Sequence, residues 1–167
     1  WALGDAHRLM GYLLLARGEL DEAERSYQQA YRHGWEPYPG YAELLLLRGR
    51  GEEAIRGLKR AASLRHWVPG ERKARYLALA ARIAAELGQL EEARSLLQIL
   101  AAEPCMGESG SMAGQVEYVR AELAWAEDQP EEALRLLHRA LELLLRRGAV
   151  MDAARIHLRL AKLLARQ

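Results

Sequence analysis

The folding of this chain is governed by a short hexad, Gly18-Glu19-Leu20-Asp21-Glu22-Ala23, of which three related copies follow. They read Gly49-Arg50-Gly51-Glu52-Glu53-Ala54, Gly88-Gln89-Leu90-Glu91-Glu92-Ala93 and Asp128-Gln129-Pro130-Glu131-Glu132-Ala133. The leading Gly, or the Asp of the last copy, suits the left-handed backbone that ends a helix. The acidic pair suits the first turn of the next helix, where free N–H groups and the dipole favour negative charge. Each hexad therefore predicts a tight turn between two helices.

Apolar residues at helical spacing flank every hexad. After the hexads they recur at i, i+4 and i+7, at Ala23, Tyr27, Ala30, then Ala54, Leu58, Ala61, then Ala93, Leu97, Leu100, and then Ala133, Leu137, Ala140. Before the hexads, amphipathic stretches cover roughly residues 4–17, 39–48, 72–87 and 112–127, each with one small residue at an equivalent place: Gly11, Ala42, Ala81 and Ala121. A small residue there lets two helices approach closely. We therefore predict helix pairs over about residues 4–36, 37–66, 71–104 and 112–147, and a partial unit at 150–167.

The composition also favours an all-α fold. The 167 residues include 31 Leu and 29 Ala but only four Val, four Ile and no Thr, Phe or Asn. This composition favours helices over strands. We expect one domain spanning residues 1–167, built as a right-handed α-α superhelix of about nine antiparallel helices. The chain begins at Trp1 in mid-pattern and ends within the partial unit, so we also expect it to be a fragment of a larger protein.

Charge and cysteine content narrow the class of protein. The net charge of +1 provides no strong field to attract nucleic acid or an anionic membrane. Charged residues interrupt every Leu run, so no stretch reaches the roughly 18 apolar residues of a membrane span. The single cysteine, Cys105, excludes an internal disulfide and fits a reducing compartment. We therefore expect a cytoplasmic protein without membrane contact.

The first helix pair resembles the tetratricopeptide repeat, whose signature is W-x2-L-G-x2-Y followed by A-x3-F and A. The best copy here reads His7-x2-Met10-Gly11-x2-Leu14, then Ala23-x3-Tyr27 and Ala30. The resemblance implies stacked helix pairs with a concave face lined by the first helix of each pair. Three of the four copies carry Leu in place of the aromatic residue. We expect a shortened helix after Pro37 and Pro39, and longer loops at Trp67–Glu71 and Pro104–Ser111.

Two further segments look like parts of the helical-repeat region of large bacterial LuxR-type transcriptional regulators. They are the Tyr-rich residues 33–50, which contain Pro37-Tyr38-Pro39-Gly40-Tyr41-Ala42, and residues 147–161, which contain Gly148-Ala149 and Ala153-Ala154-Arg155. In that family a nucleotide-binding domain usually precedes the repeats and a helix-turn-helix domain often follows them. The resemblance to activators of the maltose-regulon type, whose repeat domain holds the inducer, implies a role in binding an effector.

No motif in the chain indicates catalysis. A phosphate-binding Gly-x4-Gly-Lys-Ser/Thr loop is absent, and Gly107-Glu108-Ser109-Gly110-Ser111 lacks the pattern of a nucleophile elbow. The histidines, at positions 7, 33, 66, 138 and 157, include no i, i+4 pair for zinc, and no basic cluster surrounds Cys105. We therefore expect no enzyme activity, no cofactor and no metal.

Alignment with the tetratricopeptide pattern places one set of residues on the concave face. They are Arg8, Tyr12, Glu43, Arg82, Glu86, Tyr118, Glu122, Trp125 and Arg159. Arg, Tyr and Trp often carry binding energy, because they combine large area with directed hydrogen bonds. In the alternative interpretation the two aromatic residues Tyr12 and Trp125 only fill space between helices, and the arginines belong to solvated or ion-paired faces.

Three functions remain open at this point. The first is recognition of a protein, a peptide or a small effector in the concave groove, as part of a signal-responsive transcription regulator, with no direct contact to nucleic acid. The second is a scaffold that self-associates, with a homodimer possible, because α-helical spacing unites Leu134, Leu137, Leu141, Leu144 and Leu145. The third is a nucleic-acid-binding solenoid, prompted by 21 Arg among the 24 basic residues and opposed by the balanced charge.

Overall fold

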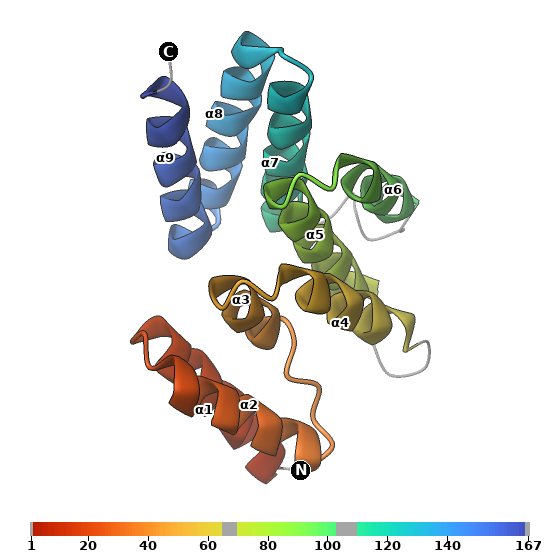
Figure 1. Cartoon of the computed structure of the whole chain (residues 1–167), viewed down its shortest axis with the longest axis vertical. Helices are drawn as coiled ribbons and strands as arrows, with labels where there is room; N and C mark the ends of the chain where they lie inside the picture. Colours follow the sequence, from red (N-terminus) through yellow and green to blue (C-terminus); the bar gives the residue numbers. More distant parts are fainter. Residues whose placement is uncertain (1, 65–69, 103–109, 166–167) are drawn as a thin grey trace. The chain divides into compact units, whose positions relative to one another are not determined.

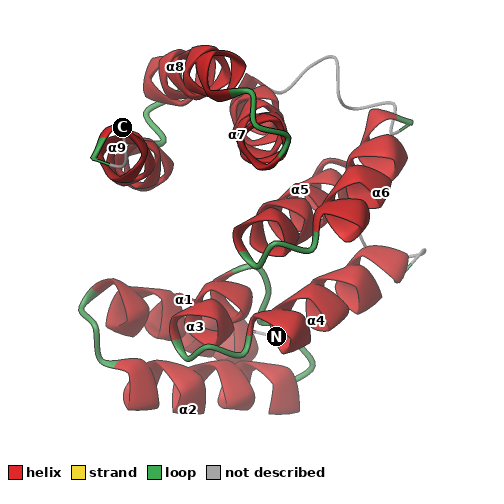
Figure 2. Ribbon diagram, turned by 45° about the horizontal axis from the view of Figure 1, so that its top comes forward, coloured by secondary structure: helices red, strands yellow, loops and turns green. Residues whose placement is uncertain are grey.

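The computed structural model describes residues 2–64, 70–102 and 110–165, and within those residues it is all-α, with nine helices and no strand (Figures 1 and 2). The helices are α1 (Ala2–Ala16), α2 (Leu20–Arg32), α3 (Gly40–Leu47), α4 (Gly51–Ser63), α5 (Gly70–Glu86), α6 (Leu90–Ala101), α7 (Gly110–Ala126), α8 (Pro130–Arg146) and α9 (Val150–Leu164). The all-α prediction is confirmed. The predicted first helices of the four pairs begin and end within a few residues of α1, α3, α5 and α7.

The helices group into two compact units, Trp1–Val68 and Pro69–Gln167. In the first unit α1 packs on α2 and α3 on α4, and α3 also contacts both α1 and α2. In the second unit α5 packs on α6 and α7 on α8, α5 contacts α7, and α9 packs on α8. Each unit therefore stacks helix pairs through their first helices, as repeat proteins do. The superhelix expected over the whole chain stays a prediction.

The turns at the hexads have the predicted left-handed backbone. The φ angle is +80° at Gly18, +72° at Gly49, +75° at Gly88 and +58° at Asp128. Each turn also carries the two hydrogen bonds of a Schellman motif: the N–H of Glu19 donates to the carbonyl of Leu14, and that of Gly18 to the carbonyl of Leu15. Equivalent pairs of bonds close the other three turns, so the first helix of each of the four pairs ends by the same local mechanism.

Replacing Asp128 with Gly is expected to raise the free energy of unfolding by about 0.5–1 kcal/mol. Asp128 is the one residue other than glycine with positive φ among the described residues, and a side chain at positive φ is strained where glycine is not. Urea unfolding followed by circular dichroism measures the change. Gly88→Ala, the matched change at an equivalent turn, should lower stability by a similar amount, whereas loss of stability in Asp128→Gly would refute this explanation of the turn.

The acidic residues after each turn lie in the first turn of the following helix, as predicted. The N-cap residues themselves make no capping hydrogen bond through their side chains. Instead, acidic residues of the first turn pair with an arginine three positions on, as in Glu22–Arg25, Glu91–Arg94 and Glu132–Arg135. The acids thus complement both the helix dipole and a neighbouring cation.

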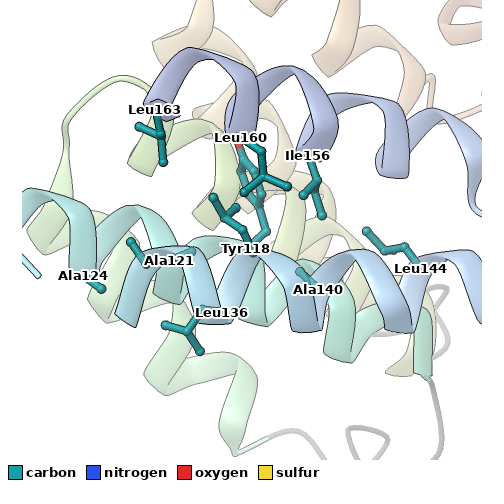
Figure 3. Packing of buried hydrophobic residues seen from close by; sticks show 11 residues of the cluster. Tyr118, Ala121, Ala124, Leu136, Ala140, Leu144, Ile156, Leu160 and Leu163 are labelled. Atoms are coloured by element: carbon teal, nitrogen blue, oxygen red, sulfur yellow. The ribbon is translucent and has the colours of Figure 1, made fainter. Parts of the chain in front are cut away.

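One hydrophobic cluster of the second unit lies between α7, α8 and α9, and Figure 3 shows its side chains. Leu137 and Leu144 of α8 are fully buried there, while Leu134 and Leu141 are half-buried against the same cluster. Of the predicted leucine stripe only Leu145 is strongly exposed, at 52%. The stripe is therefore used mainly within the unit, and it no longer argues for self-association.

Small residues at the predicted equivalent place are buried in each first helix. Ala42, Ala81 and Ala121 are at most 1% exposed. A Cβ added to Gly11 would lie 2.8 Å from the ring of Tyr27, so glycine is needed for that approach of α1 to α2. The short helix expected after Pro39 is α3. The loops predicted at residues 67–71 and 104–111 lie mostly outside the described residues, and α5 and α7 already include their last two positions.

Candidate functional site

Three helices of the second unit carry six of the residues predicted to bind a partner. One turn separates Arg82 from Glu86 on α5, and one turn separates Tyr118 from Glu122 on α7. Residues four apart lie on the same helix face. Trp125 follows on α7, and Arg159 belongs to α9.

These side chains form two hydrogen-bonded groups, one that joins α5 to α7 and one that joins α7 to α9. On α5, Arg82 Nη1 donates to Glu86 Oε1 at 2.7 Å. The hydroxyl of Tyr118 on α7 donates to the same oxygen at 3.4 Å. From α9, Arg159 donates through Nε and Nη2 to the two carboxylate oxygens of Glu122, both at 2.6 Å. We call Arg82, Glu86, Tyr118, Glu122 and Arg159 the inner network.

Much of the inner network is removed from water. Arg82, Tyr118 and Glu122 are buried, while 21% of the Arg159 side chain and 25% of the Glu86 side chain stay exposed. A charge buried without a partner is costly, and the fork geometry of Arg159 matches both oxygens of Glu122. The Glu122–Arg159 pair therefore links α9 to α7, and the edges of Glu86 and Arg159 stay accessible to a ligand.

The inner network raises the pKa values of two of its members, Tyr118 and Arg159. Burial raises the pKa of the Tyr118 hydroxyl above its usual value, and the charges of Glu122 and Glu86 raise it further. Burial by itself would lower the pKa of Arg159, but the hydrogen bonds and the charge of Glu122 outweigh this and raise the pKa. The phenol therefore stays a donor and the guanidinium stays a cation over the physiological pH range.

The raised pKa of Tyr118 predicts a loss of stability in alkali. Below pH 10 the hydroxyl is protonated in both states, so it adds no pH dependence. Above pH 10 the unfolded chain releases the proton and the folded chain keeps it, so the free energy of unfolding falls by about 1.4 kcal/mol per pH unit. Urea unfolding between pH 10 and pH 12 should show this slope reduced in Tyr118→Phe. An identical slope in both proteins would contradict the assignment.

Trp125 serves partly as a packing residue. Its side chain is half-buried against the α7–α8–α9 core, whose members include Ala121 and Leu160. The indole of Trp125 therefore fills space between helices in part, as the alternative interpretation of the sequence expected. The other part stays exposed one turn beyond Glu122 on α7, where a ligand at the inner network can reach it.

The three remaining predicted residues, Arg8, Tyr12 and Glu43, belong to the first unit. Arg8 pairs with Asp5 at 2.6 Å, Tyr12 is 55% exposed and Glu43 is half-buried. All three act electrostatically on the hydroxyl of Tyr27, which is buried. Tyr12 therefore does not fill space between helices, and the structure brings these residues together around a tyrosine that the sequence placed only in a core stripe.

Sequence reasoning missed a cavity of about 480 Å³ in the first unit. Its lining comes from α2, α4, the first turn of α3 and the segment that leads into it, and it includes Tyr31, Tyr38 and Arg60. Two signals were present in the sequence: the tyrosines clustered between residues 27 and 41, and Gly57 in the middle of an amphipathic helix. A glycine in the middle of a helix lowers the stability of that helix by about 1 kcal/mol, so it usually has a packing reason.

The described residues also bear on metal binding and membrane insertion. No group of three or more metal-ligating side chains occurs among them, and none of their helices is long and apolar enough to cross a membrane. Cys105 and residues 107–109 of the elbow-like segment lie outside the described residues. No protein-family model, no curated protein and no solved structure matches the chain.

Proposed function

We propose that this chain is a non-catalytic binding module of the tetratricopeptide type, which recognises a protein segment or a small effector on the face formed by α5, α7 and α9. The observation that carries the proposal is the inner network, which joins residues from three first helices. Arg, Tyr and Trp side chains held on rigid helices are the residue types that dominate binding energy at interfaces.

Charge pairing within the inner network supports recognition rather than catalysis. Each arginine is matched by a glutamate, so no unpaired acid or base is poised for proton transfer there. The pairs fix the side chains before a ligand arrives, which lowers the entropic cost of binding. A ligand that contacts the exposed edges of Glu86 and Arg159 would also meet the indole of Trp125.

We propose further that the module belongs to a bacterial signal-responsive regulator of the LuxR type. Support comes from the segments at residues 33–50 and 147–161, which resemble the repeat region of that family. Reading the parent gene beyond Gln167 tests the proposal. A helix-turn-helix sequence downstream supports it, and an unrelated flanking domain contradicts it.

Site-specific photo-crosslinking tests the binding face. A photoreactive amino acid at Lys162 lies one turn after Arg159 on α9, and the same group at His138 lies on the exposed side of α8. We expect position 162 to give one crosslinked adduct of defined mass between the chain and its ligand. This adduct should disappear when Trp125→Ala is added, and position 138 should give no adduct. Equal adducts from both positions, or an adduct that Trp125→Ala leaves unchanged, would remove the assigned face.

Self-association is a second candidate, because α9 exposes large apolar side chains. Val150, Met151, Leu158 and Leu164 are each more than half exposed. Two copies that pack through α9 would remove this apolar area from water. Light scattering over a range of protein concentrations measures the molecular mass in solution and so distinguishes a monomer from an oligomer. A mass that rises with concentration, and that Leu158→Ser returns to the monomer, supports self-association, whereas a constant monomer mass excludes it.

A further inference from the structure

The cavity of the first unit is built differently from the inner network, because aromatic rings and cations line one space that is partly open to solvent. It lies between α2, α4, the first turn of α3 and the segment before it, and its volume is about 480 Å³. Pockets for small molecules usually measure about 300–1,000 Å³. The lining comprises Tyr27, Gln28, Tyr31, Arg32, Pro37, Tyr38, Tyr41, Glu53, Arg56, Gly57 and Arg60.

Tyrosine rings form an ordered aromatic wall in this cavity. The ring centroids of Tyr38 and Tyr41 lie 5.9 Å apart in an edge arrangement, and those of Tyr27 and Tyr41 lie 5.8 Å apart. Tyr31 remains 57% exposed, so its ring is available to an incoming ligand. A Cβ on Gly57 would fall 1.7 Å from the Tyr38 hydroxyl, so the missing side chain allows Tyr38 to lie against α4. The wall suits a flat ring.

The charges of the cavity are not balanced by its own residues. Within the described part of the chain, neither Arg32 nor Arg60 has a carboxylate at ion-pair distance, and Arg60 acts on Glu36 only from further away. Arg56 lies 3.6 Å from Glu52 with both side chains strongly exposed. Glu53, the one acidic residue in the lining, forms an ion pair with Arg50, whose Nη2 lies 2.7 Å from Glu53 Oε2. The guanidinium donors of Arg32 and Arg60 therefore stay open to an anion.

We propose that this cavity binds a small aromatic anion, in which a planar ring lies against the tyrosines and a carboxylate or phosphate group pairs with Arg60 and Arg32. Guanidinium forks bind both kinds of anion in bidentate geometry, and the aromatic wall adds ring contacts that a bare anion lacks. The inference is independent of the function proposed for α5, α7 and α9, because no residue is shared between the two sites.

Calorimetric titration of the full chain with four probes tests the ligand class. Naphthalene-2-carboxylate and 2-naphthyl phosphate carry ring and charge, 2-naphthalenemethanol carries the ring alone, and inorganic phosphate carries the charge alone. We expect at least one naphthyl anion to bind at least about tenfold more tightly than either single-feature probe. The stronger of the two anions then identifies the acidic group of the ligand.

Matched variants locate the binding. Arg60→Gln and Arg32→Gln should each weaken binding of the naphthyl anion by about tenfold or more, because each removes charge-assisted hydrogen bonds. Arg25→Gln is the control, since Arg25 lies on α2 outside the lining and pairs with Glu22. Gly57→Ala should also weaken binding by displacing Tyr38. Circular dichroism establishes that each variant remains helical.

Three results would overturn the proposal. They are failure of both naphthyl anions to bind at millimolar concentration, equal affinity for the neutral alcohol, and anion binding that Arg60→Gln and Arg32→Gln leave unchanged. Because every residue changed in this test belongs to the first unit, a negative result leaves the photo-crosslinking test at position 162 unaffected. Failure of that test, in turn, leaves the titration unaffected.

Discussion

Tyr27→Ala is expected to lower the free energy of unfolding by about 3–5 kcal/mol, the usual cost of removing a large aromatic core side chain. The ring of Tyr27 is 1% exposed, and it packs closely against two glycines on other helices. An added Cβ would lie 2.8 Å from the ring at Gly11 of α1 and 2.3 Å from the hydroxyl at Gly40 of α3. Truncation therefore empties the junction of α1, α2 and α3.

Tyr27→Phe is the matched control for this prediction. The Tyr27 hydroxyl is buried and has no hydrogen-bond partner among the described residues. Burial also raises its pKa. Because an unsatisfied buried hydroxyl is unfavourable, its removal should leave stability unchanged or raise it by up to about 1 kcal/mol. Urea unfolding followed by far-ultraviolet circular dichroism compares the two variants. A loss in Tyr27→Phe as large as that in Tyr27→Ala would show that the hydroxyl, not the ring, supports this junction.

Leu137→Ala is expected to destabilise the second unit by about 2–5 kcal/mol. Leu137 is 1% exposed in the cluster that joins α8 to α7 and α9. Removing the isopropyl group leaves a void that neighbouring helices fill only in part. The control, Leu145→Ala, removes the same group from the exposed end of the stripe and should change stability by less than about 0.5 kcal/mol.

The comparison of the two leucines also tests whether the stripe serves packing or association. If Leu145→Ala lowered the thermal midpoint as much as Leu137→Ala does, and did so in a concentration-dependent way, the exposed end would be buried between copies of the chain. Thermal unfolding at two protein concentrations gives this result directly.

The helices and their turns were predictable because the signals are local. A left-handed turn requires glycine, or at some cost aspartate, so Gly18 and Asp128 mark their turns whatever the rest of the chain does. The acidic pairs and the apolar stripes likewise act within one or two turns of helix. These features fixed the ends of the described helices to within a few residues.

The candidate site was predictable only in part. Spacing places Arg82 above Glu86 on one helix face, and the structure shows that pair. The link from Arg159 to Glu122 spans two helices, so it depends on how α9 packs beside α7, which no local pattern specifies. The cavity was missed for the same reason, because the contact of Tyr38 with Gly57 joins residues from different elements.

A double-mutant cycle at Glu122 and Arg159 tests most directly that α7 and α9 present one connected face. Glu122→Gln, Arg159→Gln and the double variant are compared with the parent protein by urea unfolding, with the exposed pair Glu142–Arg146 of α8 as reference. A coupling free energy of about 1–3 kcal/mol is predicted for the first pair, and at most about 0.5 kcal/mol for the reference. Additive effects at Glu122 and Arg159 would contradict the inner network and the binding face proposed on it.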